Sequence, residues 1–257
     1  MGGSGWSALV DLVLPRTCAG CGLPGRLLCP RCAGLLARPH LATPRRFPEG
    51  FPPTVAAGAY EGPVRPAVLA FKERGRAELA RPLGTALALA VAAVVAAVPG
   101  PAPERVLLVP VPGSAAALRE RGRDHVRELT AHAVRELRAA GLPADSCRSL
   151  RRRGRVRDSA DLSVAQRRAN LAGTFALADG ARPAAVDELI VLVDDVVTSG
   201  ATLTEAGSVL AALGRPGGPP VLGAVVAATP REPARARRMN PPRRPDGPRP
   251  GSFRGSR

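Results

Sequence analysis

Residues 189–202 of the chain read LIVLVDDVVTSGAT. The first five residues are apolar, which is typical of a strand covered by helices on both faces, as in a parallel sheet. Two acids, Asp194 and Asp195, follow at the strand end, and a short loop with Gly200 leads into a helix expected from Thr202. Ligands of open parallel sheets bind beyond the carboxyl ends of the strands. This stretch therefore predicts both the fold class and a binding site.

The loop between the acids and the helix has the chemistry of a phosphate site. Backbone N–H groups of residues 198–202 can converge on an anion at the positive end of the helix. Gly200 permits close backbone approach, and the hydroxyls of Thr198, Ser199 and Thr202 add donors. A Walker A loop is excluded because no GxxxxGK[ST] sequence occurs. The two acids suit either two vicinal hydroxyls or a hydrated divalent cation, so the whole stretch predicts a ribose 5-phosphate ligand.

The same stretch resembles the signature of type I phosphoribosyltransferases, in which four or more apolar residues are followed by two acids, three variable residues and then Thr or Ser before Gly. The resemblance implies binding of 5-phosphoribosyl-1-pyrophosphate (PRPP) with Mg²⁺, and a catalytic role for Asp194 and Asp195 on the ribose hydroxyls. The other PRPP-binding residues it implies here are Val196, Val197, Thr198, Ser199, Gly200, Ala201 and Thr202. No nucleophilic side chain is expected, since a ribosyl cation-like transition state mainly requires positioning and charge stabilisation. The alternative is an acidic strand end followed by a simple turn.

Pyrophosphate is expected in two places. One is the turn at Pro112 and Gly113, after a strand predicted over residues 105–111. The other is a basic, polar loop predicted over residues 149–161, whose arginines include Arg157 as a PRPP-binding residue. The arginines of this loop are Arg151, Arg152, Arg153, Arg155 and Arg157. The alternative for them is a solvated charge run.

Four cysteines near the start of the sequence form two close pairs. Their spacing is Cys18-x2-Cys21-x7-Cys29-x2-Cys32, the ligand arrangement of a closed tetrahedral Zn²⁺ site. Two disulfides or a redox pair are the alternatives. The fifth cysteine, Cys147, stands alone and is expected to be a buried small residue. The sequence thus predicts a structural zinc knuckle.

A zinc knuckle ahead of a PRPP loop resembles the ComF family, also called competence protein F or amidophosphoribosyltransferase-like proteins. Other segments are similar to that family between residues 14 and 229. They are 14–18 (LPRTC), 60–65 (YEGPVR), 71–75 (FKERG), 109–112 (VPVP), 119–122 (RERG) and 162–170 (LSVAQRRAN). The chain departs from the family at residues 123–125, where Arg-Asp-His replaces the frequent Phe-Asn-Gln; His125 is then either a ligand contact or a half-exposed helical residue.

The resemblance implies a Mg²⁺-dependent phosphoribosyltransferase with a role in DNA uptake. The alternative is a non-catalytic PRPP or nucleotide sensor, or a single-stranded DNA-binding accessory of DNA uptake and recombination. A net charge of +16 suits nucleic acid or a phosphorylated substrate. Almost every basic residue is arginine, however, Lys72 being the single lysine, and this indicates a compositional bias. No aromatic residue between positions 200 and 230 offers a stacking platform for a nucleobase.

The 257 residues predict one main α/β domain with a mostly parallel sheet and helices on both faces. We expect a helix and zinc knuckle over residues 1–37, a linker over 38–53, the phosphoribosyltransferase-like domain over 54–230 and a disordered basic tail over 231–257. The helices expected are 7–14, 63–74, 77–98, 114–139, 162–171 and 202–213, and the remaining strands are 55–60, 175–177 and 221–228. With no evident targeting signal and an apolar run too short to span a bilayer, a cytoplasmic protein without membrane insertion is expected.

Overall fold

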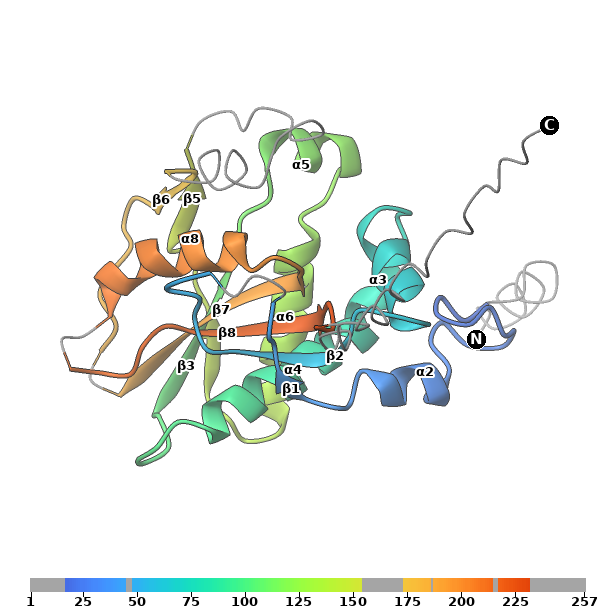
Figure 1. Ribbon diagram of the computed structural model, residues 1–257, viewed down its shortest axis with the longest axis horizontal. Coiled ribbons are helices and arrows are strands. Elements are labelled where there is room, and N and C mark those ends of the chain that lie inside the picture. The colour runs from blue at the N-terminus through green and yellow to red at the C-terminus, as the bar shows by residue number, and fades with distance from the viewer. Residues whose placement is uncertain (1–16, 45–47, 154–172, 186, 215–216, 232–257) are drawn as a thin grey trace, which may run out of the picture.

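The chain folds around a six-stranded, mostly parallel sheet with helices on both faces (Figure 1). The computed structural model describes residues 17–44, 48–153, 173–185, 187–214 and 217–231. The strands of the sheet, in spatial order, are β1 (His40–Leu41), β2 (Thr54–Ala59), β8 (Leu222–Ala228), β7 (Glu188–Val197), β3 (Arg105–Pro110) and β4 (Ala144–Ser146). All neighbours are parallel except β1, which pairs antiparallel with β2. A separate antiparallel pair joins β5 (Leu150–Arg152) to β6 (Phe175–Leu177). The predicted mixed α/β class with a mostly parallel sheet is confirmed.

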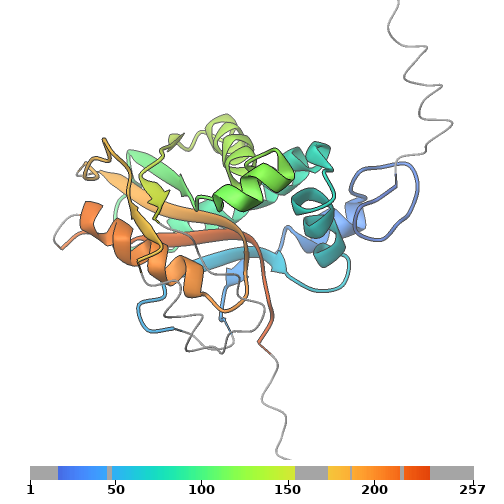
Figure 2. The ribbon, with the colours of Figure 1, turned by 90° about the horizontal axis from the view of Figure 1, so that it is seen from above.

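Helices cover the two faces of the sheet unequally. The helices of the described residues are α2 (Pro30–Leu35), α3 (Val64–Lys72), α4 (Ala80–Ala96), α5 (Ala115–Arg121), α6 (His125–Ala139) and α8 (Ala201–Leu210), with short 3-10 turns η1 (Ala77–Leu79) and η2 (Ala211–Leu213). Helices α4 and α6 pack together and against one face, while α8 lies against the other (Figure 2). Each face therefore has a hydrophobic core of its own.

Strand β7 is the central element, because its side chains alternate between these two cores. Leu189, Val191 and Val193 enter the core beneath α4 and α6. Ile190 and Leu192 enter the core beneath α8. Such a run without polar interruptions is what a strand covered on both faces requires. The strand extends past the predicted end at residue 193 and includes both acids.

The connections reverse direction between β3 and β7. From β3 the chain passes through α5 and α6 to β4 on one side, whereas from β7 it passes through α8 to β8 on the other. Both strands are parallel, so their carboxyl ends meet at the same edge. In open α/β sheets this switch point is where the connections leave a crevice for ligands. A ligand site is therefore expected at the turns after β3 and β7.

The single helix predicted over residues 114–139 is wrong, because the structure has two. Helix α5 ends at Gly122, whose φ of 66° lies in the left-handed region that closes a helix. Helix α6 then begins with Asp124 as its cap, whose Oδ1 accepts a hydrogen bond from the N–H of Arg127. The break turns the start of α6, and with it His125, toward the sheet.

Residues 38–53, predicted as a linker, contribute to the main fold. Strand β1 extends the sheet by pairing with β2. Ala42 and Phe51 are 4% and 9% exposed and belong to the core on the α8 side. Residues 45–47, like the helices predicted at 7–14 and 162–171 and most of the predicted tail, lie outside the described residues.

The apolar helix predicted over residues 77–98 is a core helix. Within the described residues, Ala77–Ala96 is the one helical segment whose length and composition would suffice to cross a membrane, and 56% of its most apolar window is buried. It packs against β8, β2 and α6. An alanine-rich helix buried between a sheet and a second helix accounts for this apolar character.

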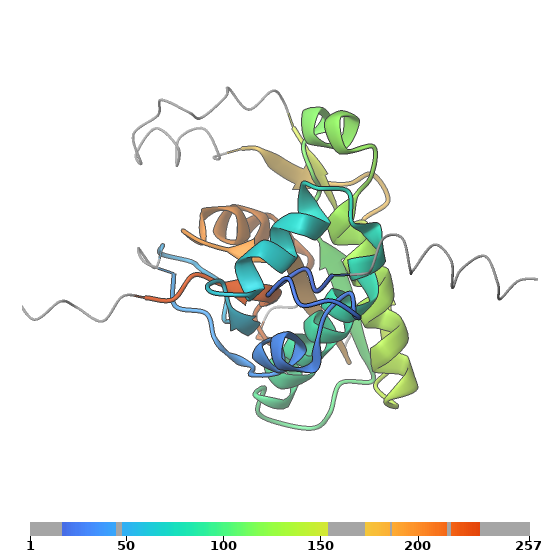
Figure 3. The ribbon, with the colours of Figure 1, turned by 90° about the vertical axis from the view of Figure 1, so that its right-hand side faces the viewer.

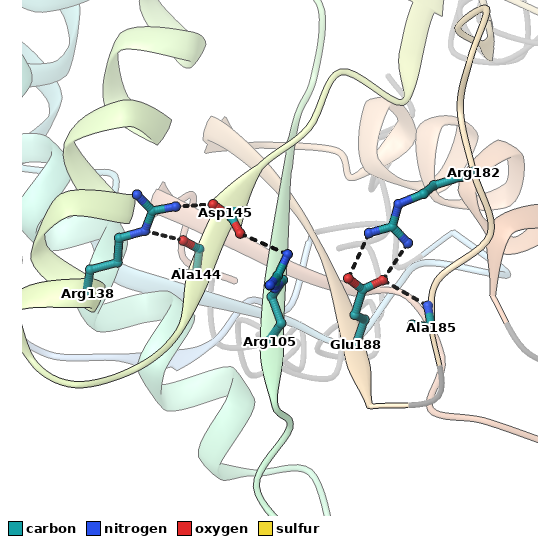
Figure 4. A network of polar contacts seen from close by, with 7 residues as sticks. All are labelled: Arg105, Arg138, Ala144, Asp145, Arg182, Ala185 and Glu188. Carbon is teal, nitrogen blue, oxygen red and sulfur yellow. Dashed lines mark hydrogen bonds and ion pairs between the residues drawn. The ribbon is translucent and has the colours of Figure 1, made fainter.

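The opposite edge of the sheet, at the amino ends of the strands, carries a network of ion pairs (Figure 4). Arg138 and Arg105 pair with Asp145 of β4. Glu188 accepts hydrogen bonds from both terminal nitrogens of Arg182, at 2.7 and 2.8 Å, and from the N–H of Ala185 at 2.8 Å. The Arg182 hydrogen bonds, followed by the Ala185 amide, lower the pKa of Glu188 to about 2.

We predict that Glu188→Gln loses a pH-dependent part of the stability. The folded pKa of Glu188 lies below its unfolded value, so the charged carboxylate stabilises the fold above about pH 4.5, and this contribution disappears as the pH falls through about 2. Urea unfolding of wild type and Glu188→Gln across this window should show two free energies that converge at acidic pH. Glu104→Gln, at an exposed position, is the control; a difference for Glu188→Gln that does not change with pH would contradict the prediction.

Candidate functional site

The two neighbouring acids at the end of β7 point to different sides of the sheet. Asp195 continues the row of Leu189, Val191 and Val193 and lies on the α4 and α6 side, where it is 2% exposed. Asp194 falls in the other row and is half-buried on the side of α8. The two carboxylates therefore lie on opposite faces at the strand end. Their predicted joint binding of one ribose diol stays a prediction.

Asp195 is engaged by two side chains from distant parts of the chain. Its Oδ2 lies 2.9 Å from Nζ of Lys72, at the end of α3, and 3.1 Å from Nε2 of His125, at the start of α6. Its Oδ1 accepts the N–H of Val196 at 2.8 Å. Burial alone would raise the pKa of Asp195, but the His125 hydrogen bond and the Lys72 charge outweigh it and hold the pKa below its usual range. Asp195 is thus a charged, fully partnered internal group.

Asp194 has the opposite electrostatic character. Burial, followed by repulsion from the charge of Asp195, raises its pKa to about 8. Its Oδ1 accepts the N–H of Asp195 at 2.8 Å, and no described residue forms an ion pair with it. A carboxyl group held in this way gains from an added cation or from hydroxyl donors. Asp194 is accordingly the acid that a ligand at the strand end would meet.

Arg152 of strand β5 links the basic loop to the turn after β3. Its Nε donates a 2.9 Å hydrogen bond to the carbonyl oxygen of Pro112, and its guanidinium stands 5.0 Å from the centre of the Phe175 ring. Burial lowers the pKa of Arg152, and the negative charge of Asp194 partly opposes this shift. The structure therefore brings three of the predicted elements together: the Pro112 turn, an arginine of the 151–157 run, and Asp194.

The other arginines of that run differ. Arg151 is exposed, and its Nε donates a 3.1 Å hydrogen bond to the carbonyl oxygen of Leu177. Arg153 is exposed as well. Arg155 and Arg157 lie outside the described residues, so the assignment of Arg157 as a PRPP-binding residue stays a prediction.

The loop after β7 forms a tight turn at the amino end of α8. Gly200 has a φ of 78° and caps the helix, which begins at Ala201. Thr198 and Ser199 are exposed, while Ala201 and Thr202 are half-buried. The first amides of a helix have no acceptors within it and attract anions. The predicted loop thus leads into the amino end of a helix, and its binding of an anion stays a prediction.

The turn at Gly200 is packed from below by the segment predicted as a linker. A Cβ at Gly200 would lie 2.8 Å from Cδ2 and 2.9 Å from Cε2 of Phe51, and 3.1 Å from Cγ of Pro44. The position therefore demands glycine for two reasons, its left-handed backbone and the absence of space. Pro44 and Phe51 therefore lie directly against the turn.

The four cysteines of the two pairs come together in one cluster. The Sγ atoms of Cys18, Cys21, Cys29 and Cys32 all lie within 4.8 Å of one another, and all four cysteines are free thiols. A tetrahedral Zn²⁺ with Zn–S bonds of about 2.3 Å separates its sulfurs by about 3.8 Å, so the cluster fits such an ion. The cluster confirms a group of cysteines that could hold a metal ion.

Hydrogen bonds to sulfur support this interpretation of the cluster. The N–H of Cys29 donates to Sγ of Cys18 at 3.3 Å. Burial alone would raise the pKa of Cys18, but backbone hydrogen bonds from Cys21, Cys29 and Gly20 outweigh this effect and lower the pKa to about 6. For Cys32, burial and the neighbouring sulfurs raise the pKa. A positive ion among the sulfurs would stabilise all four as thiolates.

No family model matches the chain, and no curated protein matches it.

Two residues of this site are not found from the sequence. In the sequence, Lys72 is noted only as part of segment 71–75, which is similar to the ComF family. For His125 the sequence allows two interpretations, a ligand contact or a half-exposed helical residue. In the structure His125 is 6% exposed and bonded to Asp195. The signal that could have found it is the position of His125 directly after a capping residue, Asp124, at the start of an amphipathic helix; the single helix predicted across this point conceals it.

We predict that Gly200→Ala destabilises the protein more than Gly180→Ala. Gly180 has a φ of 80° but no atom within 4 Å of the position that a Cβ would take, so alanine there costs only the left-handed backbone, about 1 kcal/mol. At Gly200 the clash with Phe51 adds roughly 1 to 3 kcal/mol. Chemical denaturation of the two variants should show this difference. Equal losses would mean that Phe51 does not support the loop.

Proposed function

We propose that the protein is a PRPP-binding phosphoribosyltransferase of the ComF type. The observation that carries the proposal is that the turn at the start of α8, the half-buried Asp194 and the arginine on the Pro112 turn all lie at the switch point between β3 and β7. Fold class, loop geometry and acid placement each support it. The resemblance of residues 189–202 to the type I phosphoribosyltransferase signature supplies the identity of the ligand.

The three polar parts of PRPP, which are the 5-phosphate, the ribose hydroxyls and the pyrophosphate, would meet three different groups of residues. The 5-phosphate would lie on the amides of residues 198–202, at the start of α8. The ribose hydroxyls would donate to Asp194, which has no ion-pair partner among the described side chains. The pyrophosphate would lie near Pro112 and Gly113, beside the guanidinium of Arg152.

In this arrangement the protein contributes position and charge. Arg152 would stabilise negative charge on the departing pyrophosphate, and Asp194 would fix the sugar so that an acceptor can reach its anomeric carbon. Mg²⁺, when bound with PRPP, would neutralise part of the same charge as a Lewis acid. Asp195 would hold its place behind the strand through Lys72 and His125.

We predict that zinc-replete wild-type protein binds PRPP in the presence of Mg²⁺, and that Asp194→Asn weakens this binding roughly 10- to 100-fold, because one of the two carboxyl oxygens that can accept from the ribose hydroxyls becomes an amide donor. Isothermal titration calorimetry measures both dissociation constants. Asp145→Asn, on β4 within the ion pairs at the opposite edge, is the matched control and should bind normally.

Two outcomes would count against this function. If zinc-replete wild type fails to bind PRPP, the assignment of the ligand is wrong. If it instead binds a single-stranded oligonucleotide with a steep dependence on salt, the DNA-binding alternative is the better explanation.

We predict that Arg152→Ala weakens binding of PRPP roughly tenfold but leaves binding of ribose 5-phosphate nearly unchanged, because the guanidinium lies at the pyrophosphate turn. Competition calorimetry with the two ligands separates the effects. Arg151→Ala removes the neighbouring, exposed arginine and should change neither. Equal weakening of both ligands by Arg152→Ala would place this residue elsewhere in the site.

A further inference from the structure

Lys72 is the only lysine of a chain whose lysines and arginines total 37, and it pairs with the one buried carboxylate of the described residues. Its Nζ contacts Oδ2 of Asp195 at 2.9 Å, and its side chain is 29% exposed. The same oxygen also faces Nε2 of His125. A compact ammonium shares one oxygen with a ring nitrogen more readily than a planar, five-donor guanidinium does. The exception to the arginine bias thus coincides with the partner of Asp195.

Loss of Lys72 would leave a buried carboxylate with one partner fewer. Asp195 is only 2% exposed, and a buried charge without compensation tends to move toward water or to take up a proton. Any movement of Asp195 also moves Asp194, because the N–H of Asp195 donates to Oδ1 of Asp194 at 2.8 Å. The position of the ligand-facing acid therefore depends on Lys72.

The helix that carries Lys72 is held at both ends by the cysteine-rich segment. At the amino end of α3, Gly20 packs so closely that a Cβ there would lie 2.8 Å from the carbonyl oxygen of Pro63. Beyond the carboxyl end, Arg76 donates through Nη1 to the carbonyl oxygen of Thr17 at 3.1 Å. Figures 1 and 3 show this blue segment beside the teal helix α3. Thr17 adjoins Cys18, and Gly20 adjoins Cys21.

We propose that Lys72 is a positioning residue for the acid pair, and that the metal-loaded cysteine cluster keeps it in place by clamping helix α3. The cluster fixes the backbone at Thr17 and Gly20, these contacts fix α3, and α3 delivers the ammonium to Asp195. Removal of zinc therefore loosens the end of β7, although the cluster and the acids belong to different parts of the chain. The consequence for PRPP rests on the proposed function; the physical coupling does not.

Hydrogen–deuterium exchange tests the coupling without any ligand. Removal of zinc with a chelator, checked by metal analysis, should increase exchange in residues 64–72 and 194–197 and leave the central strand at 105–110 protected. Lys72→Met with zinc bound should increase exchange in 194–197 while 64–72 stay protected. If either treatment leaves 194–197 unchanged, or if zinc removal exposes 105–110 as well, the proposed chain of contacts is wrong.

Calorimetry with PRPP and Mg²⁺ then tests the consequence. Lys72→Met should weaken binding on the order of tenfold, and Lys72→Arg should restore part of it, because a charge near Asp195 returns. Arg65→Met removes an exposed charge from the same helix and should bind normally. Zinc-free wild type should be weakened as much as Lys72→Met, and zinc removal from Lys72→Met should add nothing. If Lys72→Met and zinc removal together weaken PRPP binding by the product of their separate effects, the proposal is overturned. If wild type shows the exchange pattern but does not bind PRPP, only the proposed function is overturned.

Discussion

Consecutive residues of a β-strand point to opposite faces of the sheet, and at the end of β7 this constraint separates two neighbouring acids. The residues before them already alternate between two cores, so the strand has no freedom to turn both carboxylates the same way. Asp195 is carried into the protein and needs Lys72 and His125. Asp194 is left half-buried on the side of α8 with a raised pKa. One geometric rule thereby gives two identical side chains different surroundings and opposite pKa shifts.

The remaining parts of the site follow from where the parallel strands end. Because β3 and β7 are adjacent and their connections diverge, the turn at Pro112 and the turn at Gly200 open onto the same edge. Each turn needs support from elsewhere in the chain. Arg152 of the β5–β6 hairpin binds Pro112, and Phe51 fills the space under Gly200. The site is thus assembled from four segments that lie far apart in the sequence.

The sequence predicts those features that depend on neighbouring residues. The apolar run of β7, the glycine turn before α8 and the spacing of the cysteines are local patterns, and the structure contains a strand, a capped helix and a sulfur cluster at these places. Contacts between distant segments leave no local pattern, which is why the partners of Asp195 and the packing of Phe51 do not emerge from the sequence. The divergence of the two acids is different: it follows from the strand period and is predictable once the strand is extended past residue 193.

The cysteine-rich segment shows why a small appendage belongs to the physics of the main domain. So few residues cannot bury an independent core, and the partly buried side chains of Ala19, Leu27 and Leu28 pack against the core beneath α4 instead. A metal among the four sulfurs would make a segment that already contacts α3 more rigid. This rigidity affects the rest of the domain through the side chains of α3. Lys72 is the last residue of that helix. The long side chain of Lys72 joins this helix to the buried carboxylate of Asp195. A more rigid cysteine-rich segment therefore also gives a more rigid end of β7.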